Sequence, residues 1–102
     1  MKKIMSYDEF TSIISQSNAV VISKTQNCNV CIPVAARLNE MMKNYPSLSL
    51  YEIYIEDVPE FRGQHLVFTV PTIIVFYEGR EIHRESRFID WEKLSALFNQ
   101  II

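Results

Sequence analysis

The chain has 102 residues, of which 48% are hydrophobic and 22% charged, and its net charge is -2. This length supports one hydrophobic core, so we expect a single folded domain over residues 1–102. The lysines and arginines are scattered and form no basic stripe, which argues against nucleic acid as a partner.

No feature of the sequence indicates a membrane segment or an export signal. No apolar run approaches the roughly 20 residues that span a bilayer. The start, Met1–Met5, turns polar after two lysines and lacks the apolar core of a secretory signal. We therefore expect a cytoplasmic protein, in a compartment where structural disulfides are rare.

Capping residues and apolar spacing divide the chain into alternating helices and strands. Ser6 and Glu9 fit a capping box at a helix start, Tyr45-Pro46 stops a later helix, Glu78-Gly79 predicts a hairpin turn, and Asp90 caps the last helix. The predicted elements are a helix over 6–17, a strand over 19–25, a helix from the cysteines to about Asn44, a strand over 48–55, a short helix over 57–66, strands over 73–77 and 80–87, and a helix from Asp90 to about Ile101.

This order predicts an α/β fold, with a mixed central sheet of about four strands and helices on both faces. The run over residues 80–87 is rich in charge and is expected at the sheet edge, where charge discourages unwanted strand pairing. The two cysteines follow the carboxyl end of a strand, which is where open α/β sheets generally place their active sites.

The sequence contains two cysteines, Cys28 and Cys31, at CxxC spacing. A dithiol at a helix start is typical of a redox site, because the helix dipole stabilises a thiolate. The alternatives are two inert thiols in an ordinary helix, or a zinc site, which shares this spacing. Zinc favours four nitrogen or sulfur ligands, and His65 and His83, the other candidates, are both expected on the surface. We therefore expect a redox site with no metal or cofactor.

With these features the chain resembles the thioredoxin family over essentially its whole length. The matching features are the early helix, the strand ending at Cys28–Cys31, the Thr69–Thr72 stretch, the strand pair around Gly79 and the closing helix. The resemblance implies a thioredoxin-like fold, in which Cys28 is the nucleophile and Cys31 the resolving thiol. It also implies that Pro71 is cis and lies against the dithiol.

The resemblance further implies that Asn27, Val70 and Pro71 contact the substrate. The backbone of Val70 would be free to pair with an extended chain, as in strand addition. The alternative for Pro71 is a trans proline that simply opens a strand. Arg87 and Phe88 are candidates for the same groove, and Phe88 is equally a candidate for the core.

Several positions depart from the family pattern. The family usually has tryptophan before the first cysteine and glycine-proline between the two, where this chain has Asn27 and Asn29–Val30. Thioredoxins proper carry a buried acid at the position of Ile22, and a glycine is common at the position of Arg87. No charge lies between the cysteines, and Lys24 is the nearest positive charge in the sequence. The chain therefore resembles a divergent thioredoxin-like protein.

The replacement of the acid by Ile22, which we expect in the core, means that deprotonation of Cys31 needs another base, water or the substrate. Glu52 and Glu56 lie on a different strand and are expected to be solvated. Trp91 and the pair Met41–Met42 are expected to be packing residues of their helices.

Three functions follow from these residues. The leading one is a monomeric thiol–disulfide oxidoreductase that acts on disulfide-containing proteins or low-molecular-weight thiols. The second is a binding module that uses the same scaffold, with the dithiol idle or regulatory. The third is metal binding through the dithiol, shared between two chains.

Overall fold

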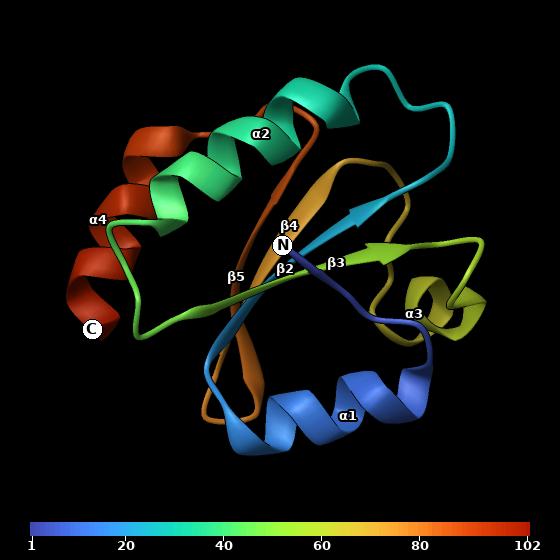
Figure 1. Cartoon of the computed structure of the whole chain (residues 1–102), viewed down its shortest axis with the longest axis horizontal. Helices are drawn as coiled ribbons and strands as arrows, with labels where there is room; N and C mark the ends of the chain where they lie inside the picture. Colours follow the sequence, from blue (N-terminus) through green and yellow to red (C-terminus); the bar gives the residue numbers. More distant parts are fainter.

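The computed structural model describes residues 1–102 and consists of one five-stranded sheet flanked by four helices (Figure 1). The elements are β1 (Lys2–Lys3), α1 (Tyr7–Gln16), β2 (Ala19–Lys24), α2 (Cys31–Met42), β3 (Ser49–Tyr54), α3 (Pro59–Gln64), β4 (Thr72–Tyr77), β5 (Arg80–Ser86) and α4 (Trp91–Ile101). None of these helices has both the length and the apolar character needed to cross a membrane.

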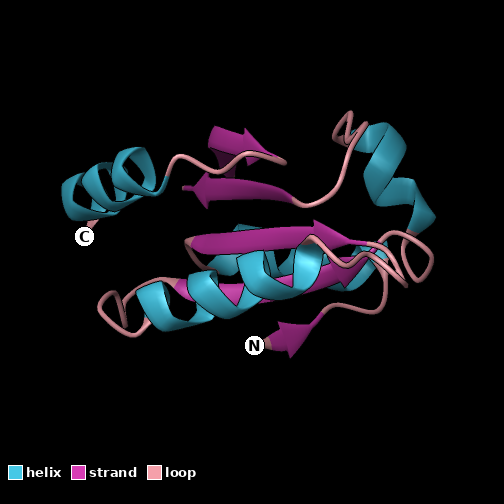
Figure 2. Ribbon diagram, turned by 90° about the horizontal axis from the view of Figure 1, so that it is seen from above, coloured by secondary structure: helices cyan, strands magenta, loops and turns pink.

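The strands are arranged in the order β1-β3-β2-β4-β5, with β1 at one edge of the row in Figure 2. β2 pairs in parallel with β3 and antiparallel with β4, so the sheet is mixed, as predicted. The sequence indicated about four strands, and β1 is the additional one. It consists of two exposed lysines, and a strand of two residues is too short to show a hydrophobic periodicity.

Helices cover both faces of the sheet, and each face has its own core. In Figure 1, α1 and α3 lie on one side and α2 and α4 on the other. Phe10 and Phe61 belong to the first core, and Leu38 and Phe98 to the second. Because both faces are covered, the first five residues of β2 are all buried, which explains its continuous apolar sequence.

Side-chain caps fix the N-termini of α1 and α4. The Ser6 hydroxyl accepts a hydrogen bond from the Glu9 N–H at 3.1 Å, as the capping box predicts. The Glu9 carboxylate reaches back one residue further than expected and accepts from the Met5 N–H at 2.7 Å. Asp90 caps α4 by accepting from the Lys93 N–H at 3.0 Å.

Helix α2 ends two residues before the predicted Asn44. The N–H groups of Asn44 and Tyr45 bond to carbonyls three residues back, at Met41 and Met42, so the chain leaves the helix in a tightened turn. Pro33 lies in the first turn of α2, where its missing N–H costs nothing, because that group has no partner within the helix. Helix α3 is also shorter than predicted and begins at Pro59.

The hairpin between β4 and β5 forms at Glu78 and Gly79, as predicted. Both residues have positive φ, 52° and 81°, which is the backbone of a tight hairpin turn. β5 is an edge strand, as predicted, and two pairs of its polar side chains are bonded, with Arg84 bonded to Glu81 at 2.7 Å and His83 to Glu85 at 2.6 Å.

Arg87 follows β5 with φ of 58°, in the left-handed region that favours glycine. Its N–H donates to the Pro71 carbonyl at 2.8 Å, so this strained residue joins the end of β5 to the loop before β4. The absence of glycine at this position thus has a conformational cost. Phe88 is 89% exposed, which rules out the core alternative for that residue.

The prediction that His65 is a surface histidine is wrong. Its ring stacks on Phe61 at a centroid distance of 4.6 Å and packs against Phe10 and Phe76. The hydroxyl of Tyr7 lies 3.0 Å from its Nε2. Burial lowers the pKa of His65 below its usual value, the negative charge of Glu81 opposes this and the positive charge of Arg84 adds to it.

A first prediction concerns Arg87. Arg87→Gly and Arg87→Ala remove the same side-chain contacts, but only glycine adopts this φ without strain. We expect the glycine variant to be more stable than the alanine variant by about 1 kcal/mol in chemical denaturation. The same two substitutions at Ser86, in the extended strand, are the control. There the Ser86→Ala variant should be more stable than Ser86→Gly. Equal stabilities at position 87 would contradict the assigned strain.

A second prediction concerns pH. Because the folded protein protonates His65 less readily than the unfolded chain does, acidification stabilises the unfolded state. The free energy of unfolding should therefore fall as pH decreases through about 6.5 and below, until His65 is protonated in the folded state as well. Urea unfolding at several pH values measures this fall. His65→Gln should remove most of this dependence of the unfolding free energy on pH, whereas His83→Gln should retain it. The same pH dependence in both variants would contradict the prediction.

Candidate functional site

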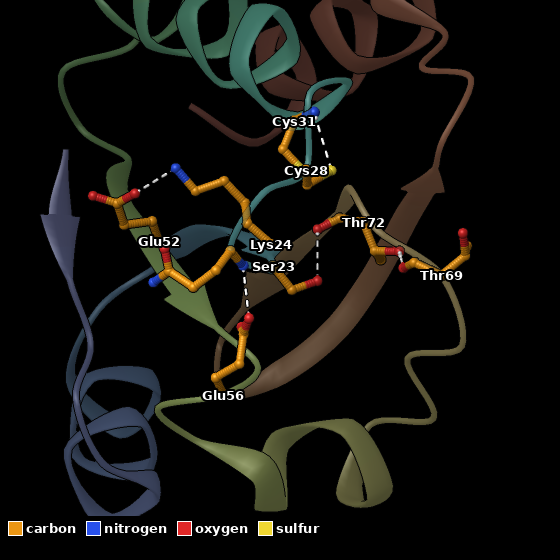
Figure 3. The surroundings of a disulfide bond; sticks show 9 residues. Ser23, Lys24, Cys28, Cys31, Glu52, Glu56, Thr69 and Thr72 are labelled. Atoms are coloured by element: carbon orange, nitrogen blue, oxygen red, sulfur yellow. Dashed lines mark hydrogen bonds and ion pairs between the residues drawn. A yellow bond between two sulfur atoms is a disulfide. The ribbon is translucent and has the colours of Figure 1, made fainter.

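Cys28 and Cys31 are joined in a disulfide at the point where the chain passes from β2 to α2 (Figure 3). Their Cα atoms are 5.3 Å apart. Cys31 is the first residue of α2, whereas Cys28 lies in the turn before the helix. The Cys31 N–H is directed at Cys28 and lies 3.3 Å from its Sγ and 3.2 Å from its carbonyl oxygen.

The two sulfurs differ in accessibility. Cys31 is 2% exposed, whereas Cys28 is only partly buried. An incoming thiolate or disulfide therefore reaches Cys28 first, and the Cys31 N–H is placed to stabilise negative charge on the Cys28 sulfur. The family resemblance implied different roles for the two cysteines, and the folded chain shows which of the two sulfurs is covered.

The turn that carries Cys28 out of β2 is shaped by two residues before it. Asn27 has φ of 61°, a conformation that asparagine tolerates better than most residues. The Gln26 N–H donates to the Glu56 carboxylate at 2.7 Å. Glu56 is exposed, as predicted, and through this bond the turn that follows β3 holds the turn with Cys28 in place.

The loop before β4 lies at the same end of the sheet, and its Val70–Pro71 peptide bond is cis, as the resemblance implied. Ser23 of β2 pairs with Thr72 in the antiparallel register, and the buried Ser23 hydroxyl donates to the Thr72 carbonyl at 3.1 Å. The Thr72 hydroxyl donates to the Thr69 carbonyl at 2.7 Å and lies 3.1 Å from that of Ser86. These bonds tie the loop to the strand that leads to the dithiol.

Two hollows adjoin each other here. A cleft of about 320 Å³ contains both cysteines, and its other lining residues are Lys24, Thr25, Gln26, Asn27, Asn29, Ile32 and Tyr54. A smaller cavity of about 90 Å³ shares Thr25 and is lined by Phe68 and Val70 among others. Asn27 thus lies beside the dithiol and Val70 in the neighbouring cavity, whereas Pro71 is buried and lines neither.

Lys24 is the one charged residue that lines the cleft, and its Nζ forms an ion pair with Glu52 of β3 at 2.6 Å. The side chains of Lys24 and Glu52 are only 12% and 16% exposed, so the expectation that Glu52 is solvated is wrong. Burial alone lowers the pKa of Lys24, but the bond and the charge of Glu52 outweigh it and raise that pKa above its usual value.

Sequence reasoning missed this pair, although the alternation of strand residues contained a signal for it. Lys24 shares a sheet face with Val20 and Ile22, because side chains two apart on a strand point the same way. Ile22 is fully buried, as predicted, and pairs with Glu52 in the register of β2 and β3. What the sequence lacked was that register, which brings Glu52 beside Lys24.

The remaining predicted residues lie away from the dithiol. Met42 is buried and Met41 and Trp91 pack against the same core, which confirms them as packing residues. Trp91 also lies under the Arg37 guanidinium at 4.7 Å. No group of three or more histidine, cysteine, aspartate or glutamate side chains gathers anywhere in the structure.

Comparison with known proteins agrees with this geometry. The thioredoxin family model matches residues 2–101. The chain is 35% identical over 74 residues to the thioredoxin-like protein YdfQ of Bacillus subtilis, a match covering 72% of this chain and 66% of that one. It is 27% identical to the thioredoxin of Chlamydia caviae, with 98% of each chain covered.

Among solved structures, a thioredoxin of Plasmodium falciparum superposes with a TM-score of 0.88 at 23% identity, with all of both chains covered. This likeness confirms the predicted fold, and the match to the family model covers almost the entire sequence. The protein with the Cys28–Cys31 disulfide is a member of the thioredoxin family.

Proposed function

We propose that this protein is a thiol–disulfide oxidoreductase in which Cys28 is the nucleophile and Cys31 the resolving thiol. The observation that carries the proposal is the asymmetry of the pair, with an accessible Cys28 bonded to a covered Cys31 at the start of α2. A nucleophile must reach its partner, whereas a resolving thiol has only to reach the nucleophile.

The reaction proceeds in two exchanges that balance. In the reduced protein the Cys28 thiolate attacks one sulfur of a substrate disulfide, and the other sulfur leaves with the electron pair and takes a proton from water. Cys31 then loses its proton and attacks the Cys28 sulfur, which re-forms the observed disulfide and releases the second substrate thiol. The substrate gains two electrons and two protons, and a reductant of the thiol class must return the dithiol to its reduced form.

The surroundings of the dithiol favour a protein disulfide as the substrate. Val70 makes no hydrogen bond through its main chain, so its N–H and C=O can pair with an extended peptide. Phe68, 79% exposed, lines the cavity beside Val70, and the exposed Ile32 lines the dithiol cleft. We assign Asn27, Val70 and Pro71 to substrate contact or to shaping the loop that makes it, and we expect glutathione disulfide to react more slowly.

The same proposal covers the setting of the protein. We propose that residues 1–102 act as one domain, because all five strands belong to one sheet with a core on each face. We further propose that the protein acts as a monomer. We propose the cytoplasm as its location, since its pool of reduced thiols would regenerate the dithiol.

A binding module with an idle dithiol is the second candidate. The uncharged Asn29 and Val30 between the cysteines and the exposed Phe68 and Phe88 favour it, because they offer contact surface without adding to thiolate stabilisation. This candidate predicts partner binding that survives the loss of Cys28.

A third prediction separates these candidates. Wild-type protein should accelerate insulin reduction by dithiothreitol, and Cys28→Ser should reduce the rate to that of dithiothreitol alone. Cys31→Ser, reduced and then freed of dithiothreitol, should retain the first exchange and accumulate a mixed disulfide with insulin, detected by non-reducing electrophoresis. Equal insulin turnover by wild type and Cys28→Ser is the result that rejects the enzyme and leaves the module.

A further inference from the structure

The Lys24–Glu52 ion pair is a charged element of the dithiol cleft that the disulfide chemistry described above does not use. Lys24 is held from two sides, by the Glu52 carboxylate at 2.6 Å and by the Tyr54 ring, whose centroid lies 4.9 Å from Nζ. Both ends of the pair are largely covered by protein. Ion pairs of this kind are screened less than exposed ones, so their field persists nearby.

The pair has a definite orientation relative to the sulfurs. Lys24 lines the cleft together with Cys28 and Cys31, whereas Glu52 does not line it. In Figure 3 the Lys24 side chain leaves β2 between the dithiol and Glu52, and its ammonium end is directed at the Glu52 carboxylate. Lys24 is therefore the member of the pair that shares a cavity with the sulfur atoms.

No acidic side chain lines the cleft that Lys24 shares with the dithiol. Lys24 projects from the same face of β2 as Ile22, two residues further toward the cysteines, and Ile22 is fully buried among apolar residues. The other charged or titratable groups near the pair are Tyr54, Lys3, whose Nζ lies 4.8 Å from the same ring, and Glu56, which is bonded to the Gln26 N–H.

We propose that Lys24 stabilises the thiolate form of the dithiol from within the cleft, and that Glu52 is the positioning residue that holds the ammonium group there. The thiol proton passes to water and the sulfur keeps the electron pair. The ammonium group makes that charged state more favourable without accepting the proton. Stabilisation of the thiolate by a cation in the cleft offsets the absence of charge at Asn29 and Val30.

This inference specifies how the proposed dithiol site is tuned and so rests on the proposed function, but its test requires no turnover. The test measures the alkylation rate of Cys28 by iodoacetamide in the reduced protein as a function of pH, with the modified cysteine identified by mass spectrometry. Because the thiolate is the form that reacts, the midpoint of the rate profile is the pH at which half of the Cys28 thiol is ionised. A protein inactive toward insulin still gives this midpoint, so failure of one proposal is distinguishable from failure of the other.

The fourth prediction is a set of opposite shifts. Lys24→Met should raise the midpoint by about one pH unit, which slows alkylation about tenfold at pH values below it. Lys24→Arg should stay near the wild-type value. Glu52→Gln should lower the midpoint, because the ammonium group loses the charge that partly neutralises it. If the ion pair had a purely structural role, Lys24→Met and Glu52→Gln would shift the midpoint in the same direction.

Lys43→Met is the matched control, because it removes the same charge from an ion pair of α2. Lys43 pairs with Glu40 at 3.0 Å on the surface, at the far end of the helix and about 18 Å along its axis from Cys31. It should leave the midpoint unchanged. A Lys24→Met midpoint equal to that of Lys43→Met would overturn the proposal, as would upward shifts in both Lys24→Met and Glu52→Gln when circular dichroism shows all variants folded.

Discussion

The hydrogen bonding of β2 to a strand on each side is the constraint on which the rest of the structure depends. Its parallel register with β3 places Glu52 beside the strand end that carries Lys24, and its antiparallel register with β4 places Thr72 opposite Ser23. A slip of one residue would turn every side chain of β2 to the opposite face. Ala19 and Val21 belong to one core and Val20 and Ile22 to the other, so a slip would force both cores to repack.

The same constraint explains how a loop-rich site can be well defined. The turn with Cys28 is tied through Glu56 to the turn after β3, and the loop with Pro71 is tied to β2 through Ser23 and to the end of β5 through Arg87. Each bond joins segments distant in sequence, and each ends on a backbone atom. The loops therefore take their positions from the sheet, and the dithiol, the Val70 backbone and Lys24 share one end of it.

Electrostatically, this chain differs from the pattern that the family resemblance implied. With Ile22 in the core, the one charged residue that lines the dithiol cleft is a lysine paired with a carboxylate on the neighbouring strand. An ion pair of this kind is neutral overall, so its effect on the sulfurs depends on which end faces them. Here Lys24 lines the cleft and Glu52 does not. The replacement of an acid by Ile22 and the presence of Lys24 at the end of β2 are best understood together.

Local patterns predicted most elements because short-range physics determines them. The capping of α1 by Ser6 and the turn at Glu78-Gly79 depend on side-chain geometry within a few residues. The strand β1 escaped prediction because its two lysines form a strand only through pairing with β3. His65 was misplaced because its burial comes from aromatic residues of α1 and β4, which only the folded chain brings to it.

The site divides in the same way. The sequence by itself determined the dithiol and its position after a strand, and it indicated redox chemistry, because two cysteines at this spacing before a helix are a local feature. Only the tertiary structure decided which sulfur is covered, that Val70 keeps a free backbone, and that Glu52 faces Lys24. The physical reason is that burial and charge pairing are properties of neighbours in space, and here those neighbours come from strands that meet only in the sheet.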